Sequence, residues 1–392
     1  MLVDLHAHYP MHLLPSEHSA THDRLRDWKT ERFRALVVRF ISRFANYEGP
    51  HGDDPSVTPK LMADGNVGVA LSVLYLPFDE IDFSKSYGDP PDASYFQRLL
   101  DQLRVVEEDA AKHADKLAVA HTGAELGAVM ESGRTALVHA LEGGFQLGPD
   151  DRRLAAHVRT LKERGVAYIT VAHLFYRGVA TNAPALPFLP DWLYNLVFPQ
   201  NRREGLSPLG VALVEAMLAN RILIDITHMS DRAADHLFRL LATRDPDRTV
   251  PVMATHGACR LGSEEYCLRD ETIREVAARD GVIGLILCDH HMRDGVRRKQ
   301  TKTLDDSLEV LCAHIDHLHE VTGSMRHIGI GSDLDGYIKP ALAGLGHMGQ
   351  MKALQEALAE RYGAGDAQLI CSGNSLRVLQ SYWGAAAAGP PD

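Results

Sequence analysis

The sequence has little of what marks several common classes of protein. Five cysteines, at 259, 267, 288, 312 and 371, are odd in number, scattered and never spaced as Cys-x-x-Cys. A disulfide framework or a thiolate zinc site is therefore not expected. No apolar run reaches membrane-spanning length, and the first residues leave no room for a signal peptide. We accordingly expect a cytoplasmic protein with no membrane partner.

Positive charge and several well-known catalytic motifs are also lacking. The net charge of −11 disfavours binding to nucleic acid or to an anionic surface. The sequence contains no HExxH, no GxxxxGK[ST], no GxSxG and no GxGxxG behind a strand. The stretch "IGIGSDLDG" at 328–336 has paired glycines, but acidic residues follow them, so we do not expect it to bind phosphate.

Histidine is what the sequence has in excess, with 21 copies in 392 residues. Many of these lie on helical patterns that face solvent. In the segment 304–321, apolar residues keep helical spacing, which predicts that His314 and His317 lie mostly on polar faces. We expect no ligand role for that pair.

Short β-branched runs alternate with longer helical patterns, which is typical of βα units. Helical patterns cover, for example, 95–114 and 271–280. A weaker run at 117–122 is placed outside the main sheet. The sequence therefore predicts an α/β fold, a (β/α)8 TIM barrel with long loop insertions at the C-terminal face. The eight predicted strands are 2–6, 67–76, 135–142, 166–173, 222–228, 249–256, 281–288 and 327–333.

Two segments interrupt this alternation within a single predicted domain, residues 1–384. Residues 9–64 have a helical core at 23–47, and residues 174–208 contain five prolines. Both follow the carboxyl ends of strands, where barrel active sites lie, so we expect them to shape or cover a pocket. Residues 385–392 are expected to form a flexible tail.

Ionisable side chains stand at the ends of six predicted strands, and such ends surround one mouth of a barrel. A single histidine after a strand is more often structural, but four strands that end in histidine point to a metal site. Imidazole and carboxylate ligands suit Zn²⁺. Five ligands are too many for one catalytic zinc but suit two ions bridged by Glu142, which precedes two glycines in "HALEGG". The strand-end residues are His6, His8, Glu142, His173, His228, His256 and Asp333.

The order of motifs resembles the membrane (renal) dipeptidase family, metallopeptidases of the amidohydrolase-type barrel group. The resemblance covers most of the chain in one order. The combination of "IDITHMS", "ALEGG" and "GSDLDG" is specific, although each alone would be weak. The other matching segments are "VDLHAH", "LKERGVAYITVAHL", "GLSPLGVALVEAML", "PVMATHGACR", "GVIGLI" and "CSGNSLRVL".

The resemblance implies two zinc ions per subunit and hydrolysis of a small amide, above all a dipeptide. His6 and the residue at position 8 would bind the first ion, His228 and His256 the second, and Glu142 both.

Further roles follow from the same resemblance. His173 would polarise the scissile carbonyl, and Asp333 would hold the substrate amine and move a proton. Asp335 is expected to cap a loop instead. The family's substrate-binding arginine has Arg269 as its first candidate here and Arg260 as its second. The family's tendency to form homodimers is carried over as an expectation.

Position 8 departs from the family, which usually has aspartate where this chain has His8. This exchange removes a negative charge from the predicted metal site at the barrel mouth. The loss of charge should lower the pKa of a bridging water and weaken the binding of the first ion. Two alternatives therefore stay open. One is another amidohydrolase activity, such as N-acyl amino acid deacylation or lactone opening. The other is a catalytically silent barrel that keeps its metals.

Overall fold

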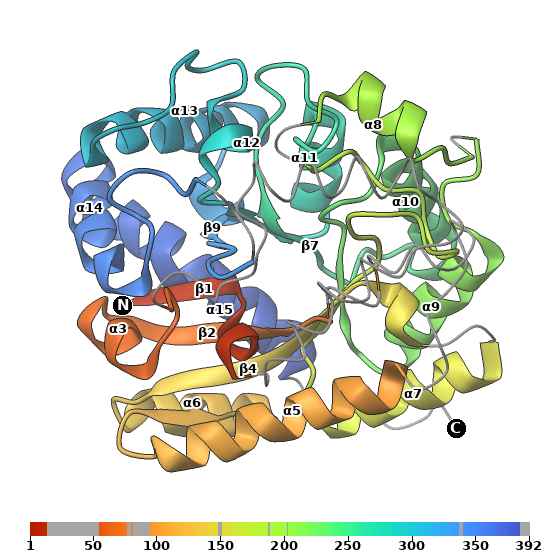
Figure 1. The fold of residues 1–392 in the computed structure, drawn as a ribbon, viewed down its shortest axis with the longest axis horizontal. Helices are drawn as coiled ribbons and strands as arrows, with labels where there is room; N and C mark the ends of the chain where they lie inside the picture. Colours follow the sequence, from red (N-terminus) through yellow and green to blue (C-terminus); the bar gives the residue numbers. More distant parts are fainter. Residues whose placement is uncertain are drawn as a thin grey trace, which may run out of the picture.

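The computed structural model describes residues 1–13, 55–76, 80, 95–147, 151–186, 189–201, 203–336 and 340–384. Its strands form one parallel sheet in the order β2-β1-β9-β8-β7-β6-β5-β4-β3, and a pairing between β2 and β4 closes eight of them into a barrel. The predicted (β/α)8 barrel is thereby confirmed (Figure 1). The strands are β1 Leu2–Ala7, β2 Val67–Leu74, β3 Leu117–Val119, β4 Thr135–Glu142, β5 Tyr168–Thr170, β6 Leu223–Asp225, β7 Val252–Gly257, β8 Val282–Leu285 and β9 Ile328–Ile330.

The ninth strand, β3, lies outside the barrel wall, as its weak pattern predicts. It pairs with the first half of β4, from Leu117 opposite Thr135 to Val119 opposite Leu137. The barrel strand β5 pairs with the far end of β4, at Leu141 and Glu142. The two short strands β3 and β5 therefore pair with different parts of β4, β3 with its first half and β5 with its end.

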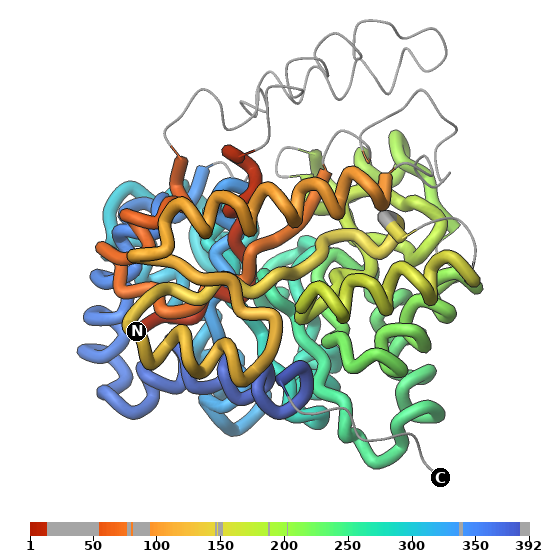
Figure 2. The backbone as a smooth tube through the Cα atoms, turned by 90° about the horizontal axis from the view of Figure 1, so that it is seen from below, coloured from red at the N-terminus to blue at the C-terminus, as the bar shows by residue number. Residues whose placement is uncertain are grey.

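Helices surround the barrel, and their amphipathic sequences explain why (Figure 1). Several begin at a Ser or Thr whose side chain accepts a hydrogen bond from the first turn, as Ser207, Ser230 and Thr303 do. Figure 2 shows α5 lying across the side of the molecule that carries β3 and β4. The helices are α3 Pro59–Asp64, α5 Tyr95–Lys112, α6 Gly123–Glu131, α7 Asp151–Glu163, α8 Asp191–Val197, α9 Pro208–Ala219, α10 Asp231–Arg244, α11 Asp270–Ala278, α12 Asp289–Arg293, α13 Leu304–Thr322, α14 Met351–Gln368 and α15 Asn374–Val378. Shorter helical turns are Tyr9–His12, Gly144–Leu147, Met325–His327, Met348–Gln350, Leu369–Gly373 and Leu379–Trp383.

The barrel strands are almost completely buried. At two glycines, one in β8 and one directly after β9, the backbone lies too close to β7 to leave room for a side chain. A Cβ atom on Gly331 would lie 1.7 Å from the Thr255 carbonyl oxygen, and one on Gly284 would lie 2.0 Å from the same atom. Glycine is therefore needed at both positions. This close packing brings the ends of β7 and β9 together on one rim of the barrel.

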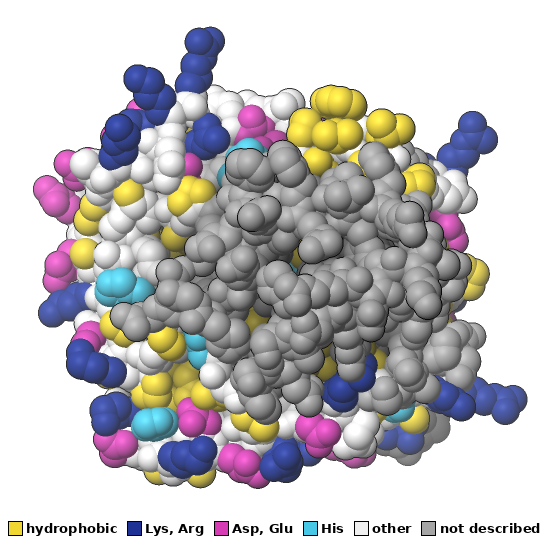
Figure 3. Space-filling model, in the orientation of Figure 1, with side chains coloured by type: hydrophobic (Ala, Val, Ile, Leu, Met, Phe, Trp, Pro, Cys, Tyr) yellow, Lys and Arg dark blue, Asp and Glu magenta, His cyan; other side chains and the backbone are white. Residues whose placement is uncertain are grey.

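The two insertions are described to different extents. The predicted helical core at 23–47 and the tail at 385–392 lie outside the described residues, as does most of the insertion at 9–64. The insertion at 174–208 contains α8 and a small hydrophobic cluster around Tyr194 and Phe198. Trp192 and Leu196 on α8 are 68% and 70% exposed, and Figure 3 shows hydrophobic side chains gathered over this helix. Within the described part of the chain, no helix combines the length and hydropathy required to cross a bilayer.

The prediction that His314 lies on a polar face of α13 is wrong. Its side chain is fully buried. The Cys259 amide donates to its Nδ1 at 3.0 Å, and its Nε2 lies 2.7 Å from the Met292 carbonyl. His314 therefore joins α13 to α12 and to the chain after β7, whereas His317 pairs with Asp270 at 2.8 Å.

Candidate metal centre

Glu142 ends β4 and lies at the centre of a group of histidines at the barrel mouth. Its side chain is buried, and its two oxygens face imidazole Nε2 atoms from three other parts of the barrel rim. The separations from Oε1 are 3.3 Å to His6, 3.4 Å to His256 and 3.6 Å to His228, and Oε2 lies 3.5 Å from His8. The structure thus brings together all five residues that the sequence predicts as metal ligands.

The hydrogen bonds behind His6 fix which of its ring nitrogens carries the proton. Tyr168 donates its hydroxyl proton to the Leu5 carbonyl at 3.0 Å, so the phenolic oxygen is left to accept from His6 Nδ1 at 2.7 Å. With the proton on Nδ1, the lone pair of Nε2 points to Glu142. That tautomer is the one a metal-bound histidine needs.

A similar chain of hydrogen bonds lies behind His256. Thr255 donates its hydroxyl proton to the Asp225 carboxylate at 2.7 Å and lies 3.0 Å from His256 Nδ1, which donates to it. Asp225 also accepts from the hydroxyls of Thr170 and Thr227, so it joins the ends of neighbouring strands. His256 is therefore also held with an Nε2 lone pair toward Glu142.

These neutral imidazoles and Glu142 fit a cation. The Nε2 atoms of His228 and His256 lie only 2.9 Å apart, and those of His6 and His8 lie 3.2 Å apart. Burial lowers the pKa of His228 to about 4, and it lowers the pKa of His8 and of His256 as well. Nitrogen lone pairs that converge on a carboxylate repel one another unless a positive ion lies between them.

The donor atoms fall into overlapping groups, each compact enough for one ion. His6, His8 and Glu142 form one such group, and Glu142, His228 and His256 form another, with all donor atoms of each group within 4.8 Å. Glu142 belongs to both groups. The set of imidazole nitrogens and a shared carboxylate matches what metal-dependent hydrolases use.

His173 approaches the same carboxylate from a loop after β5. Its Nε2 lies 3.3 Å from Glu142 Oε1, and its Nδ1 donates to Glu80 Oε2 at 2.6 Å. Glu80 also accepts from the Tyr75 hydroxyl at 2.6 Å and from the Phe175 amide at 2.9 Å. Burial alone would lower the pKa of His173, but the charges of Glu142 and Glu80 outweigh burial and raise it to about 10.

Glu80 was not predicted from the sequence. The second strand run has no ionisable residue at its end, and Glu80 follows four residues after Leu76 in a stretch without periodicity. The usable signal was an acidic residue just beyond the carboxyl end of a strand, on the side of the barrel where the other ligands lie.

Asp333 lies beside His8, on the loop after β9. Its Oδ1 is 3.1 Å from His8 Nε2 and 3.8 Å from His6 Nε2. Burial raises the pKa of Asp333 well above its usual value, and the nearby negative charge of Glu142 raises it further. Its backbone has φ of 56°, in the left-handed region, and a Cβ on Gly336 would lie 1.8 Å from its Oδ1. The backbone of His228, at φ 67°, is strained in the same way, which is common at functional sites.

Asp335 has the capping role expected of it. Its carboxylate accepts from the amides of Ser56 and Val57, at 3.1 and 2.9 Å, and lies 3.1 Å from His12 Nε2. It therefore ties the chain around residue 56 to the loop after β9.

The structure does not bring the two predicted arginines into contact with the histidine group. Arg260 forms a double ion pair with Asp231, at 2.7 and 2.8 Å, and its guanidinium also donates to the Cys267 and Glu265 carbonyls. Arg269 pairs with Asp235 on the same helix, α10. A role in substrate binding stays a prediction for both residues.

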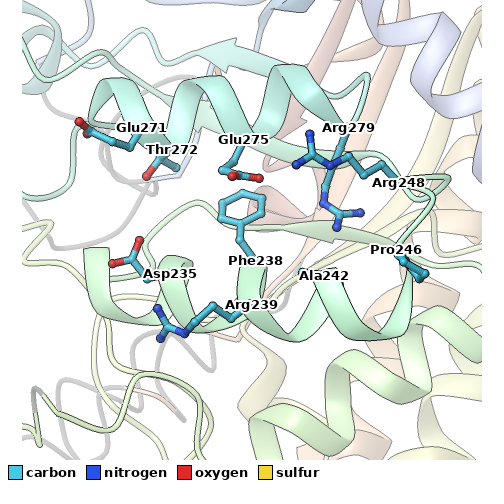
Figure 4. A pocket seen from close by; sticks show the side chains of 10 residues that line it. All are labelled: Asp235, Phe238, Arg239, Ala242, Pro246, Arg248, Glu271, Thr272, Glu275 and Arg279. Atoms are coloured by element: carbon cyan, nitrogen blue, oxygen red, sulfur yellow. The ribbon is translucent and has the colours of Figure 1, made fainter.

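A separate hollow of about 420 Å³ lies on the outer side of the barrel between α10 and α11 (Figure 4). Its lining mixes positive and negative side chains, and Arg279 there already pairs with Asp245 at 2.6 Å. The lining contains none of the residues grouped around Glu142. The hollow is therefore separate from the candidate metal centre at the barrel mouth.

The family of this chain follows from its similarity to known proteins. A model of the family described as "Membrane dipeptidase (Peptidase family M19)" matches residues 2–388. The chain belongs to the membrane dipeptidase family. As a member of that family it is a metal-dependent dipeptidase, and the resemblance seen in the sequence motifs is confirmed.

Individual relatives are distant. Dipeptidase verJ of Clonostachys rogersoniana is 24% identical over 321 residues, which cover 81% of this chain and 73% of that protein. A Klebsiella pneumoniae protein described only as uncharacterized, from the pqqA 5′ region, is 26% identical over 309 residues, which cover 76% of this chain and 98% of that protein.

Solved structures share the fold at low identity. Dipeptidase AC, a metallopeptidase, has a TM-score of 0.70 and 20% identity, over 98% of this chain and 99% of that one. A metallopeptidase from Rhodobacter sphaeroides, solved with a phosphinate mimic of the dipeptide L-Ala-D-Ala, has a TM-score of 0.67 and 20% identity, over 97% and 99%. These likenesses support the barrel architecture.

Proposed function

We propose that the enzyme cleaves the amide bond of a dipeptide at a centre of two Zn²⁺ ions that share Glu142. The observation that carries the proposal is the position of this carboxylate, with both oxygens 3.3–3.6 Å from histidine Nε2 atoms. His6 and His8 would hold one ion and His228 and His256 the other. Zinc is supported by the donor set, which is imidazole nitrogen and carboxylate oxygen with no thiolate.

A pair of bound zinc ions would supply an acidic shared water and polarise the scissile carbonyl. The protein's side chains stabilise the developing charge and transfer the proton. His173, held by Glu80, donates from Nε2 to the carbonyl oxygen as negative charge develops there. Because Glu80 occupies Nδ1, only Nε2 of this ring faces the reacting atoms.

Asp333 moves the proton. Its carboxylate takes a proton from the attacking water and gives it to the leaving nitrogen as the C–N bond breaks, so the products are a free carboxylic acid and an amine. Before that step the same carboxylate holds the substrate's amino group. Its place beside His8, at 3.1 Å, puts it at the edge of the proposed metal pair.

A substrate panel combined with metal analysis tests the proposal. Purified enzyme is loaded with zinc, and turnover is measured on L,L- and L,D-dipeptides, N-acyl amino acids and lactones. We expect about two zinc ions at the barrel mouth and fastest turnover on a dipeptide. Bound ions without turnover of any substrate would instead identify a silent metal-binding barrel.

A second candidate activity is favoured by His8. This imidazole stands where the family usually has a carboxylate, and it faces both Glu142 and Asp333. A less negative mouth would accept the carboxylate of an N-acyl amino acid more readily. Faster turnover of N-acyl amino acids than of dipeptides in the same panel would support this candidate and contradict the first.

A further inference from the structure

A second group of side chains with the donor atoms of a metal site lies away from the barrel mouth. It lies where α5 passes β3 and β4, whose backbone Figure 2 shows. Glu107 comes from α5, His121 follows β3, and His139 lies within β4. Successive side chains of a strand point to opposite faces, so His139 points out of the barrel because Glu142, three residues later, points in. The two groups are therefore separated by the barrel wall.

The donor atoms of this outer group have the spacing of metal ligands. Glu107 Oε1 lies 3.1 Å from His121 Nε2 and 3.7 Å from His139 Nε2, and one donor atom from each residue falls within 4.8 Å of the others. Ligands at about 2.0–2.1 Å from a tetrahedral zinc are about 3.3 Å apart. The observed separations lie on both sides of that value.

The environment of His139 is a second observation that favours a bound cation here. Its side chain is fully buried, yet neither ring nitrogen has a hydrogen-bond partner among the described residues. A buried polar group without a partner destabilises the fold. A cation bound at His139 Nε2 would give that nitrogen a partner.

The surroundings orient the other two ligands. Glu125 Oε2 lies 3.2 Å from His121 Nδ1 and accepts the His121 amide at 2.8 Å, so the Nε2 of this ring is directed to Glu107. Arg164 donates to Glu107 Oε2 at 2.8 Å, which leaves Oε1 for the imidazoles. Ligating histidines and carboxylates usually have such second partners.

We propose that Glu107, His121 and His139 form a structural zinc site, with water as the fourth ligand, that fastens α5 to the outer edge of the sheet. The site is independent of the centre around Glu142 and does not depend on the function proposed above. His121 is accessible from solvent, with 37% of its side chain exposed, so an ion can enter. The charge of Arg164 reduces the affinity, and we expect weaker binding than at the barrel mouth.

Ion counting on the full-length enzyme tests the site. The enzyme is stripped with chelator, reloaded with zinc and passed through gel filtration, and zinc per chain is measured by mass spectrometry. We expect His121→Ala to bind one ion fewer than the wild type while it keeps dipeptidase turnover. His319→Ala, which removes an exposed histidine from α13, is the matched control and should bind as many ions as the wild type.

Two further measurements locate the ion. Zinc should raise the Tm of stripped wild-type enzyme more than that of His121→Ala, and Glu125→Gln should bind the outer ion about 10- to 100-fold more weakly. Crystals soaked in zinc should show an anomalous peak between Glu107, His121 and His139. Equal zinc counts in the wild type and His121→Ala, or anomalous peaks at the barrel mouth with none at this position, would overturn the proposal.

Discussion

Glu80 accepts a 2.6 Å hydrogen bond from His173 Nδ1, while the opposite nitrogen of the same ring lies 3.3 Å from Glu142. The ring is thus fixed between two carboxylates, one on each side. Tyr75 and Phe175 hold Glu80 in turn, through its two oxygens. His173 therefore has one orientation available, with Nε2 toward the proposed metal pair.

Glu80→Gln should lower kcat about 10- to 100-fold and change KM much less. The amide still fills the space but no longer supplies the charge that keeps His173 protonated. Steady-state kinetics on the best dipeptide give both constants. Glu108→Gln, at an exposed position on α5, is the control, and an unchanged kcat in Glu80→Gln would show that Glu80 only fills space.

His228→Ala should abolish turnover and release metal while the barrel stays folded. The side chain supplies one of the two histidine nitrogens, 2.9 Å apart, that would hold the second ion. We expect a loss of at least about 10³-fold in kcat, the order of effect seen when a principal electrostatic group of an active site is removed. Metal analysis, far-UV circular dichroism and kinetics are measured together, and full turnover in this variant would refute the ligand assignment.

His8→Asp tests the departure from the family directly. Without metal, the new carboxylate would face Asp333 and Glu142, so the variant should have a lower Tm than the wild type in chelator. With zinc, the added negative charge should tighten binding at least about tenfold. Thermal melts with chelator and with zinc separate these effects, and a lower Tm under both conditions would argue against a metal at position 8.

Glu264→Gln should show how the charge of one half-buried carboxylate contributes to the stability of the fold at different pH values. Burial would raise the pKa of Glu264, but hydrogen bonds from His290 and His291 outweigh it and lower the pKa from 4.5 to about 2. A pKa that is lower in the folded state stabilises the fold above pH 4.5, and this contribution is lost as pH falls from 4.5 towards 2.

We expect Glu264→Gln to be less stable than the wild type by about 2 kcal/mol at pH 6, with a smaller difference at pH 3.5. Urea unfolding at the two pH values measures the difference. A difference that does not change with pH would show that the carboxylate charge does not contribute.

Much of the fold could be predicted because the buried faces of strands and helices produce a regular spacing of apolar residues in the sequence. All eight barrel strands and the outlying β3 follow β-branched runs at the expected places. Strand ends were less accurate. The run predicted at 166–173 contains a strand only at Tyr168–Thr170, because the chain leaves the sheet there to aim His173 at the barrel mouth. The orientation of His173 thus outweighs the strand propensity of the residues around it.

The grouping of these histidines around Glu142 could be predicted because the topology brings the strand ends to one rim, and that needs no knowledge of side-chain packing. Contacts between segments that are distant in the sequence could not be predicted in this way. Glu80 gave no periodic signal, and the burial of His314 depends on contacts with α12 and with the chain after β7, which helical periodicity cannot place. The homodimer and the cytoplasmic location stay predictions, the latter in keeping with five free, buried cysteines.

Anomalous diffraction at the zinc edge, from crystals of the zinc-loaded enzyme, tests most directly whether Glu142 joins two ions. At the barrel mouth we expect two peaks roughly 3.5–4 Å apart, in addition to the peak expected at Glu107, His121 and His139. One should lie between Glu142, His6 and His8, and the other between Glu142, His228 and His256. A single peak at the barrel mouth, or two peaks there that do not both contact Glu142, would contradict the account.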